Sequence, residues 1–235
     1  MLKDAPSIQM IEVVAAALGD LLPEVVFIGG ATTPFYIKDE ATPEVRPTED
    51  VDCIIEIADR SDYYELESKL RSKGFSHSDA KNAPICRWKV GGISVDVMPT
   101  DKSILGFSSR WYKVGIRSAI QVNLPSGKMI SIFSLPYFIA AKIEAYHDRG
   151  TGDFRLSHDI EDIVMVLDGQ VDFTVLDHAP PTVLKYLKET FAVFLRDNRF
   201  LESLSGHLEP GPTNVARTKH LLTFLNKFAA QPLSL

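Results

Sequence analysis

The sequence predicts an α+β protein: a mixed β-sheet with flanking helices, followed by a purely helical part. Two observations carry this prediction. Up to residue 133, short β-branched runs bounded by glycine pairs alternate with helical patterns. From Leu135 onward, apolar residues recur only at helical spacing. We therefore expect an α+β domain over residues 1–133 and a helical domain over residues 134–235.

The elements of the first domain follow from their patterns in chain order. Apolar residues from Ile8 to Leu22 recur at helical spacing and stop before Pro23, which predicts an opening helix. The run 25–30 is β-branched and ends in two glycines, as a buried strand before a tight turn does. A helix is expected at 61–74, and further strands at 50–57, 83–90, 93–99 and on both sides of 125–127.

Turn residues also predict how these strands pair. Gly91-Gly92 separates two strand patterns by two residues, which is typical of a hairpin of antiparallel neighbours. Pro125-Ser126-Gly127 gives a second hairpin signature. In the second domain, helical periodicity predicts helices at 135–150, 157–169, 181–197 and 214–230.

Length and composition are those of an ordinary globular protein. The 235 residues are 45% hydrophobic and 24% charged, enough for a core without disulfides or structural metal. A net charge of −6 argues against broad, sequence-independent binding to nucleic acid. Cys53 and Cys86 lie in hydrophobic runs, typical of buried thiols in a reducing compartment, although one disulfide between them stays open. Glu12 and Asp20 interrupt the N-terminal apolar run, so we expect neither signal peptide nor membrane span, and a cytoplasmic protein.

Three aspartates stand where ordinary strand residues are expected. Asp50 and Asp52 begin an apolar run, and alternation along a strand points both carboxylates to one face. Asp96 lies between two valines of a later strand. If the two strands are neighbours, the three carboxylates lie within about 6 Å of one another, as ligands of one or two shared ions do. Carboxylate oxygens suit Mg²⁺ or Mn²⁺ rather than zinc.

The turn at Gly29-Gly30 is the second feature with chemical meaning. Glycines allow the backbone to approach a ligand closely, and the N–H groups of a following helical turn favour anions such as phosphate. Ala31, Thr32 and Thr33 follow the glycine pair and lead into an apolar helical turn. Taken singly, each feature has a plainer alternative: an ordinary turn, a solvated strand edge at the Asp-x-Asp pair, or an ion pair of Asp96 with Arg87 across the hairpin.

In this order, the features resemble the nucleotidyltransferase superfamily of DNA polymerase β. That pattern is a glycine pair, an acid-x-acid strand and a third acid on a nearby strand. Here it corresponds to Gly29-Gly30, to Asp50 and Asp52 preceded by Thr48, and to Asp96.

Within that superfamily, one group is especially similar. Residues 46–52, Arg-Pro-Thr-Glu-Asp-Val-Asp, resemble the R-x-T-x-D-hydrophobic-D form of the AbiEii-type abortive-infection toxins. Ala141-Lys142, Arg149 and residues 157–162 resemble the helical A-K-(x)n-R and K-D-x-x-D segments of the same group. His158 departs from it, since a histidine replaces the usual lysine. The resemblance spans roughly residues 25–168.

The resemblance implies roles for particular residues. Asp50 and Asp52 would bind the metal and position the nucleotide phosphates, and Asp96 would complete the site and help activate the acceptor. Lys142 and Arg46 have plainer alternatives, as a solvated lysine and as a partner of Glu44 or Glu49. The residues implied to bind nucleotide are Gly29, Gly30, Thr32, Thr33, Lys142 and Arg149, and those implied to support the site are Arg46, Thr48 and Asp159.

We interpret the chain as a metal-dependent nucleotidyltransferase that transfers NMP from an NTP to a hydroxyl and releases pyrophosphate. The acceptor stays open between a tRNA, a protein side chain and a small molecule such as an aminoglycoside. The resemblance further suggests the toxin of a toxin–antitoxin or phage-defence pair, with an antitoxin protein as partner. Two rival interpretations are a non-catalytic nucleotide-binding or partner-binding module of the same fold, and a structural domain whose acids are surface residues.

Overall fold

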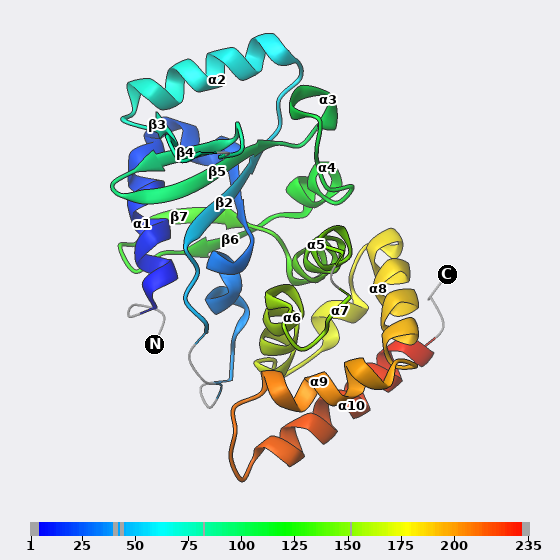
Figure 1. Ribbon diagram of the computed structural model, residues 1–235. Helices are drawn as coiled ribbons and strands as arrows, with labels where there is room; N and C mark the ends of the chain where they lie inside the picture. The colour runs from blue at the N-terminus through cyan, green and yellow to red at the C-terminus, as the bar shows by residue number, and fades with distance from the viewer. Residues whose placement is uncertain (1–4, 40–41, 43–44, 82, 151, 232–235) are drawn as a thin grey trace. The chain divides into compact units, whose positions relative to one another are not determined.

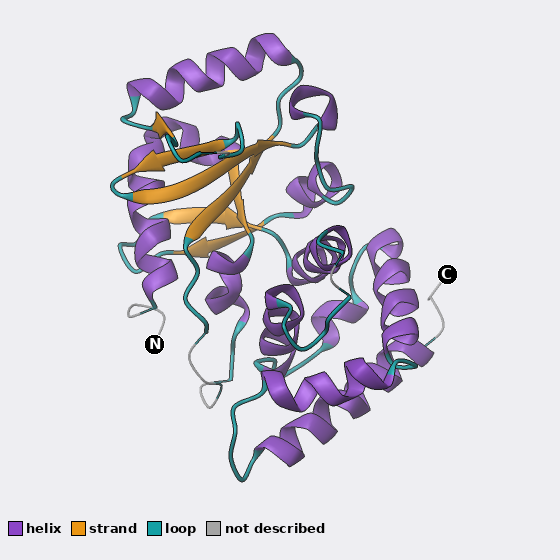
Figure 2. Ribbon diagram, in the orientation of Figure 1, coloured by secondary structure: helices purple, strands orange, loops and turns teal. Residues whose placement is uncertain are grey.

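The computed structural model describes residues 5–39, 42, 45–81, 83–150 and 152–231. It divides into two compact units. The first contains the described residues of Met1–Phe35 and Val45–Ser134, and the second those of Tyr36–Glu44 and Leu135–Leu235. Strands occur in the first unit and helices dominate the second (Figure 2), which confirms the predicted α+β class. Among the described helices, none has the length and apolar character needed to cross a membrane.

The first unit is built on one mixed sheet with the strand order β3-β4-β5-β2-β1-β7-β6 (Figure 1). At its centre, β2 runs antiparallel to β1 and parallel to β5, and β1 runs parallel to β7. The central strands are rich in Val and Ile that are buried on both faces, as expected of strands covered by helices. The strands are β1 Val25–Ile28, β2 Asp50–Ile55, β3 Ser76–His77, β4 Arg87–Val90, β5 Ile93–Pro99, β6 Ile120–Asn123 and β7 Met129–Ile132.

Two longer helices cover this sheet. Helix α1 (Pro6–Leu18) packs on β2, β4 and β5 through a fully buried apolar stripe that includes Ile8 and Ile11. Helix α2 (Arg60–Ser72) begins at Asp59, whose carboxylate accepts hydrogen bonds from two backbone N–H groups of the first turn. The shorter helical segments are η2 Gly19–Glu24, η3 Gly30–Tyr36, α3 Lys102–Leu105, α4 Tyr112–Gly115 and η4 Ile116–Ser118.

Both predicted hairpins are present. β4 and β5 pair antiparallel around Gly91-Gly92, and β6 and β7 pair antiparallel around residues 125–127. The strand predicted at 83–90 is shorter than expected: β4 starts only at Arg87, because a turn precedes it in which the Arg87 N–H donates to the Pro84 carbonyl. Proline favours such a turn since its ring fixes φ and removes a ladder donor.

The second unit is a helical bundle. Helix α5 packs on α6 and α8, and α8 packs on α10. Large aromatic side chains fill the core, among them Phe138, Phe191 and Phe228. The helices are α5 Leu135–Asp148, α6 His158–Asp168, α7 Thr174–Asp177, α8 Pro181–Phe194, α9 Asn198–His207 and α10 Asn214–Ala230. The periodicity predicts four of them. Helix α7 is a single turn, and α9 starts at Asn198 after an Asp197 cap, which the prediction places at the end of the preceding helix.

The segment from Tyr36 belongs to the helical unit, although the predicted boundary put it in the first domain. Backbone N–H groups of Lys38 and Asp39 donate to the Gly169 carbonyl at 2.8 and 3.0 Å. The buried Gln170 amide donates to the Tyr36 carbonyl at 2.6 Å. These contacts bind the segment to the C-terminal end of α6, and a domain boundary placed by sequence order cannot anticipate them.

Candidate metal and nucleotide site

Three aspartates lie together on one face of the central sheet. β2 and β5 pair so that Asp52 stands opposite Asp96, and Asp50 lies two residues earlier on the same face of β2. One carboxylate oxygen from each residue lies within 4.8 Å of the others. The predicted convergence within about 6 Å is therefore confirmed.

The opposite face of the same strands fixes this orientation. Val51, Cys53, Val95 and Val97 alternate with the acids and are completely buried or nearly so. A slip of one residue would place these apolar side chains in solvent, so the register is strongly specified. Burial raises the pKa of the Cys53 thiol well above its usual value, and the neighbouring Asp52 and Asp96 act in the same direction. Cys53 is thus a protonated core thiol rather than a metal ligand.

Arg87 on β4 lies in the same row across the sheet, opposite Asp96. Its Nε donates to Asp96 Oδ1 at 2.8 Å, and its Nη2 donates to Asp96 Oδ2 at 2.7 Å and to Asp50 Oδ2 at 3.1 Å. The hydrogen bond to Asp96 raises the pKa of the Arg87 guanidinium, against the opposing effect of burial. The ion pair of Asp96 with Arg87, which the sequence offers as an alternative to the metal site, is therefore present, and the same guanidinium also contacts Asp50.

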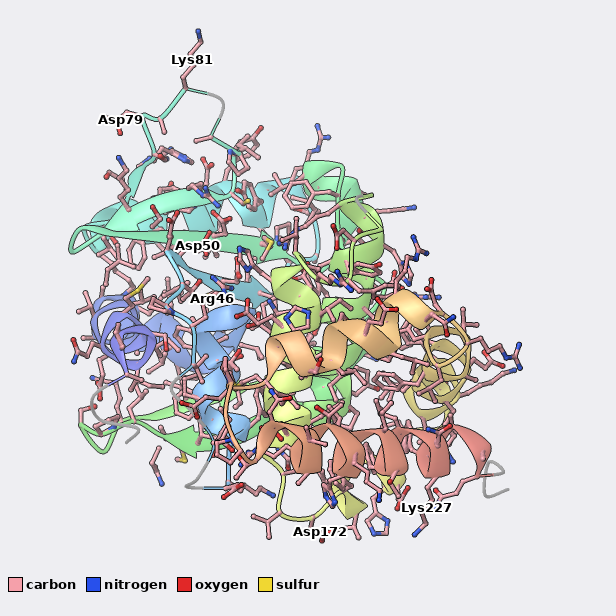
Figure 3. All side chains as sticks on the ribbon, turned by 60° about the horizontal axis from the view of Figure 1, so that its bottom comes forward. Arg46, Asp50, Asp79, Lys81, Asp172 and Lys227 are labelled. Atoms are coloured by element: carbon pink, nitrogen blue, oxygen red, sulfur yellow. The ribbon has the colours of Figure 1, made fainter. Side chains whose placement is uncertain are left out.

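The residues before Asp50 support its position. Thr48 donates from its hydroxyl to Asp50 Oδ1 and to the Asp50 carbonyl, each at 3.4 Å. Arg46 donates from Nη1 to the Pro47 carbonyl at 3.0 Å. Figure 3 labels Asp50 and Arg46, the latter on the segment that leads into β2. Thr48 thus contacts the site directly, whereas the hydrogen bond of Arg46 to Pro47 shapes the segment that leads to it.

Gly29 is required by the position of Asp52. The register pairs Ile28 with Asp52, so the next residue lies beside the Asp52 carboxylate. A Cβ at Gly29 would overlap Asp52 Oδ2, and its φ of +74° lies in the left-handed region that favours glycine. The following turn is closed by the N–H and hydroxyl of Thr32, which both donate to the Gly29 carbonyl. Thr33 is fully buried, and its hydroxyl has no hydrogen-bond partner among the described residues.

The donor set fits a hard divalent cation. Three carboxylates offset by one guanidinium leave two negative charges in a partly buried cluster, which repel one another unless a cation lies between them. Oxygen donors of this kind match Mg²⁺ and Mn²⁺, and each carboxylate places an oxygen close enough to the others to share an ion. Asp50, Asp52 and Asp96 are therefore the residues that would hold it.

Lys142, Arg149 and Asp159 form a separate cluster within the helical unit. Lys142 Nζ lies 2.5 Å from Asp162 Oδ2 and 3.3 Å from Asp159 Oδ1, joining α5 to α6. The Asp159 and Asp162 side chains are only 1% and 3% exposed, and Lys142 is 12% exposed. Arg149, largely exposed, donates to the other oxygen of Asp159 at 2.6 Å. His158 is exposed and pairs with Glu161. A nucleotide-binding role for Lys142 and Arg149 stays a prediction.

The contact of Gly29 with Asp52 makes a prediction. Gly29→Ala is expected to displace the Asp52 carboxylate and lower Mn²⁺ affinity about tenfold or more, as changes that misplace metal ligands do. The matched control is Gly127→Ala, where φ is +82° and nothing lies within 4 Å. Both variants bear the cost of a positive φ, about 1–2 kcal/mol. Calorimetric Mn²⁺ titration compares the two variants. Equal affinity would contradict the prediction that displacing the Asp52 carboxylate weakens Mn²⁺ binding.

Comparisons with known proteins give structural neighbours of low identity. No family model and no curated protein matches the chain. Among solved structures, it is similar to the antibiotic-resistance factor ANT(2'')-Ia, with a TM-score of 0.48 and 13% identity over 80% of this chain and 95% of that one. It is also similar to JHP933 from Helicobacter pylori, with a TM-score of 0.47 and 12% identity over 95% of this chain and 91% of that one. Both scores lie below 0.5, so the function proposed next rests on the site and the sequence motifs.

Proposed function

We propose that the chain is a metal-dependent nucleotidyltransferase whose site is formed by Asp50, Asp52 and Asp96. The convergence of these three carboxylates within 4.8 Å, on neighbouring strands and on one face, carries the proposal. Gly29 supports it, because the turn brings backbone against the same carboxylates. The order of glycine pair, acid-x-acid strand and third acid is the pattern that the sequence shares with the nucleotidyltransferase superfamily.

The reaction we propose is the transfer of NMP from an NTP to a hydroxyl. The acceptor oxygen forms a bond to the α-phosphorus, the bond from that phosphorus to the bridging oxygen breaks, and pyrophosphate leaves. Asp50 and Asp52 would hold the cation that orients the phosphates, and Asp96 helps to remove the hydroxyl proton. A divalent cation at these carboxylates neutralises phosphate charge and polarises the reacting groups.

The biological role we propose is that of a toxin in a toxin–antitoxin or phage-defence pair. The motif Arg46-x-Thr48-x-Asp50-Val51-Asp52 supports it, as the form shared with AbiEii-type toxins. The acceptor stays open between a tRNA, a protein and a small molecule, and an antitoxin would be the partner of the toxin.

A transfer assay tests the activity. The protein is incubated with each α-³²P-labelled NTP, Mg²⁺ and a cell extract, and we expect label on one class of acceptor with release of pyrophosphate. The labelled product identifies nucleotide and acceptor together. Label that binds without transfer would favour the non-catalytic module instead, and absence of both binding and transfer with all four NTPs would refute the proposal. Omission of Mg²⁺ and Mn²⁺ is the matched control.

A further inference from the structure

Arg87 contacts two of the three carboxylates that would bind a cation. It shares a cross-strand row with Asp96 and Asp52, and it contacts Asp96 through two nitrogens and Asp50 through one. From the sequence, Arg87 is expected only as an alternative partner of Asp96. The signal was nevertheless present: with Gly91-Gly92 as the hairpin turn, counting back along both strands pairs residue 87 with residue 96.

The guanidinium and a divalent cation compete for the same oxygens. Arg87 uses both oxygens of Asp96 and one of Asp50. A cation that takes these oxygens as ligands removes the acceptors of Arg87 and places two positive charges beside a third. Because the Arg87 side chain is 31% exposed, it can move toward solvent without first unpacking the sheet.

Arg87 is also suited to the substrate that accompanies the cation. Its planar fork binds phosphate in the two-point manner in which it binds a carboxylate, and it stays charged at all physiological pH values. Lys89, the other cation on this face of β4, pairs instead with the exposed Asp79 at 2.7 Å. Figure 3 shows Asp79 on a loop that projects from the sheet.

We propose that Arg87 is an exchangeable counter-ion. In the metal-free protein it binds Asp96 and Asp50, and when a cation replaces it at these carboxylates it transfers to a nucleotide phosphate. This inference rests on the proposed function and adds a residue to it. The exchange separates Asp96 from the guanidinium only after metal and nucleotide have entered. It also couples the two ligands, because a phosphate that accepts Arg87 favours the metal-bound arrangement.

Four full-length proteins test the exchange: wild type, Arg87→Gln, Arg87→Lys and Lys89→Gln. Mn²⁺ affinity is measured by calorimetry and by electron paramagnetic resonance, without nucleotide. We expect Arg87→Gln to bind Mn²⁺ about tenfold or more tightly than wild type, because the competing charged hydrogen bonds are gone. Arg87→Lys keeps the charge but loses the fork, so it should also gain affinity. Lys89→Gln removes a nearby charge that does not contact the acids, and should match wild type.

Nucleotide binding is then measured at saturating Mn²⁺ with α,β-methylene analogues of the four NTPs. Here the expected sign is reversed: Arg87→Gln should bind the accepted analogue about tenfold or more weakly than wild type. Thermal melting with and without Mn²⁺ verifies that each variant folds. Arg87→Lys provides the measurement if Arg87→Gln does not fold, because it retains a positive charge beside Asp96.

The outcomes separate this inference from the proposed function. Tighter Mn²⁺ binding together with weaker nucleotide binding supports the exchange. Equal Mn²⁺ affinity in wild type and both Arg87 variants overturns it while leaving the metal site intact, and so does unchanged nucleotide affinity. If only Arg87→Gln and Lys89→Gln gain affinity, the general positive field of β4 explains the gain and the exchange is wrong. Absence of Mn²⁺ binding in all four proteins refutes the metal site, and the exchange with it.

Discussion

Asp52→Asn is expected to abolish nucleotidyl transfer while leaving the metal-free protein as stable as wild type, or more stable. Transfer should fall by about a hundredfold to a thousandfold, the scale of removing one group that stabilises the charge of a transition state. The reason is that asparagine keeps the size of the side chain but loses the negative charge that a cation requires. No other carboxylate of the described site lies on β2 at the position opposite Asp96.

Whereas Asp52→Asn lowers activity, it is expected to raise the stability of the metal-free protein. Asp52 and Asp96 are like charges placed opposite each other on neighbouring strands. Removing the Asp52 charge is therefore expected to raise the free energy of unfolding in metal-free buffer by about 0.2–1 kcal/mol. In Mg²⁺ the order reverses, because the variant loses the stabilisation that a bound ion gives the folded state.

Urea denaturation with chelator and with Mg²⁺, together with the labelled-NTP assay, measures both effects. Asp79→Asn is the matched control, since it also removes one carboxylate from the first unit but only from an exposed pair with Lys89. A loss of stability with chelator in Asp52→Asn, absent from Asp79→Asn, would show that Asp52 is structural.

The same two variants test the toxin role. Growth arrest on expression should disappear with Asp52→Asn and persist with Asp79→Asn.

Much of the site could be predicted because its residues follow from local patterns. Alternation along β2 places Asp50 and Asp52 on one face, and a two-residue hairpin places Arg87 beside Asp96. The pairing of β2 with β5 is different, because two strands about 40 residues apart become neighbours only through the packing of the whole sheet. The sequence motif supplied that pairing as an expectation, and periodicity alone could not.

The helical unit shows where sequence reasoning reaches its limit. The helical spacing of a lysine on an amphipathic helix is compatible both with a solvated side chain and with a ligand-binding one, so spacing alone does not distinguish the two roles. What decides its surroundings is the packing of α5 against α6, which buries Asp159 and Asp162 next to Lys142. The attachment of the segment at Lys38 and Asp39 to Gly169 depends in the same way on contacts distant in sequence.

Lys142→Ala is therefore expected to destabilise the protein strongly, by about 3–5 kcal/mol, the scale of breaking a buried ion pair by removing one partner. Asp159 keeps Arg149 as a partner, whereas the ion pair of Asp162 with Lys142 is lost. Since alanine is the better helix former, the loss cannot come from α5 itself. It comes from two buried carboxylates that lose a positive charge. Compared with a typical stability of about 5–15 kcal/mol, the change is large.

The sequence motif alone predicts a different result for the same variant: nucleotide binding weaker by about 1.5–3 kcal/mol, with the helix intact. Combined substitutions separate the two effects.

Lys142→Met removes the charge but keeps most of the side-chain volume, so it should lose nearly as much stability as Lys142→Ala. Adding Asp162→Asn should restore much of the loss, because a neutral amide is far less costly to bury than a carboxylate. Lys185→Ala is the control: its ion pair with Glu189 is exposed at both ends, and its removal should cost at most about 1 kcal/mol. Urea denaturation in metal-free buffer measures all four proteins, and a loss below about 1 kcal/mol in Lys142→Ala would contradict the burial of an unbalanced charge. An NTP titration of the Lys142→Met, Asp162→Asn protein with Mg²⁺ then tests nucleotide binding in a folded background, where unchanged affinity would remove Lys142 from the proposed nucleotide-binding residues.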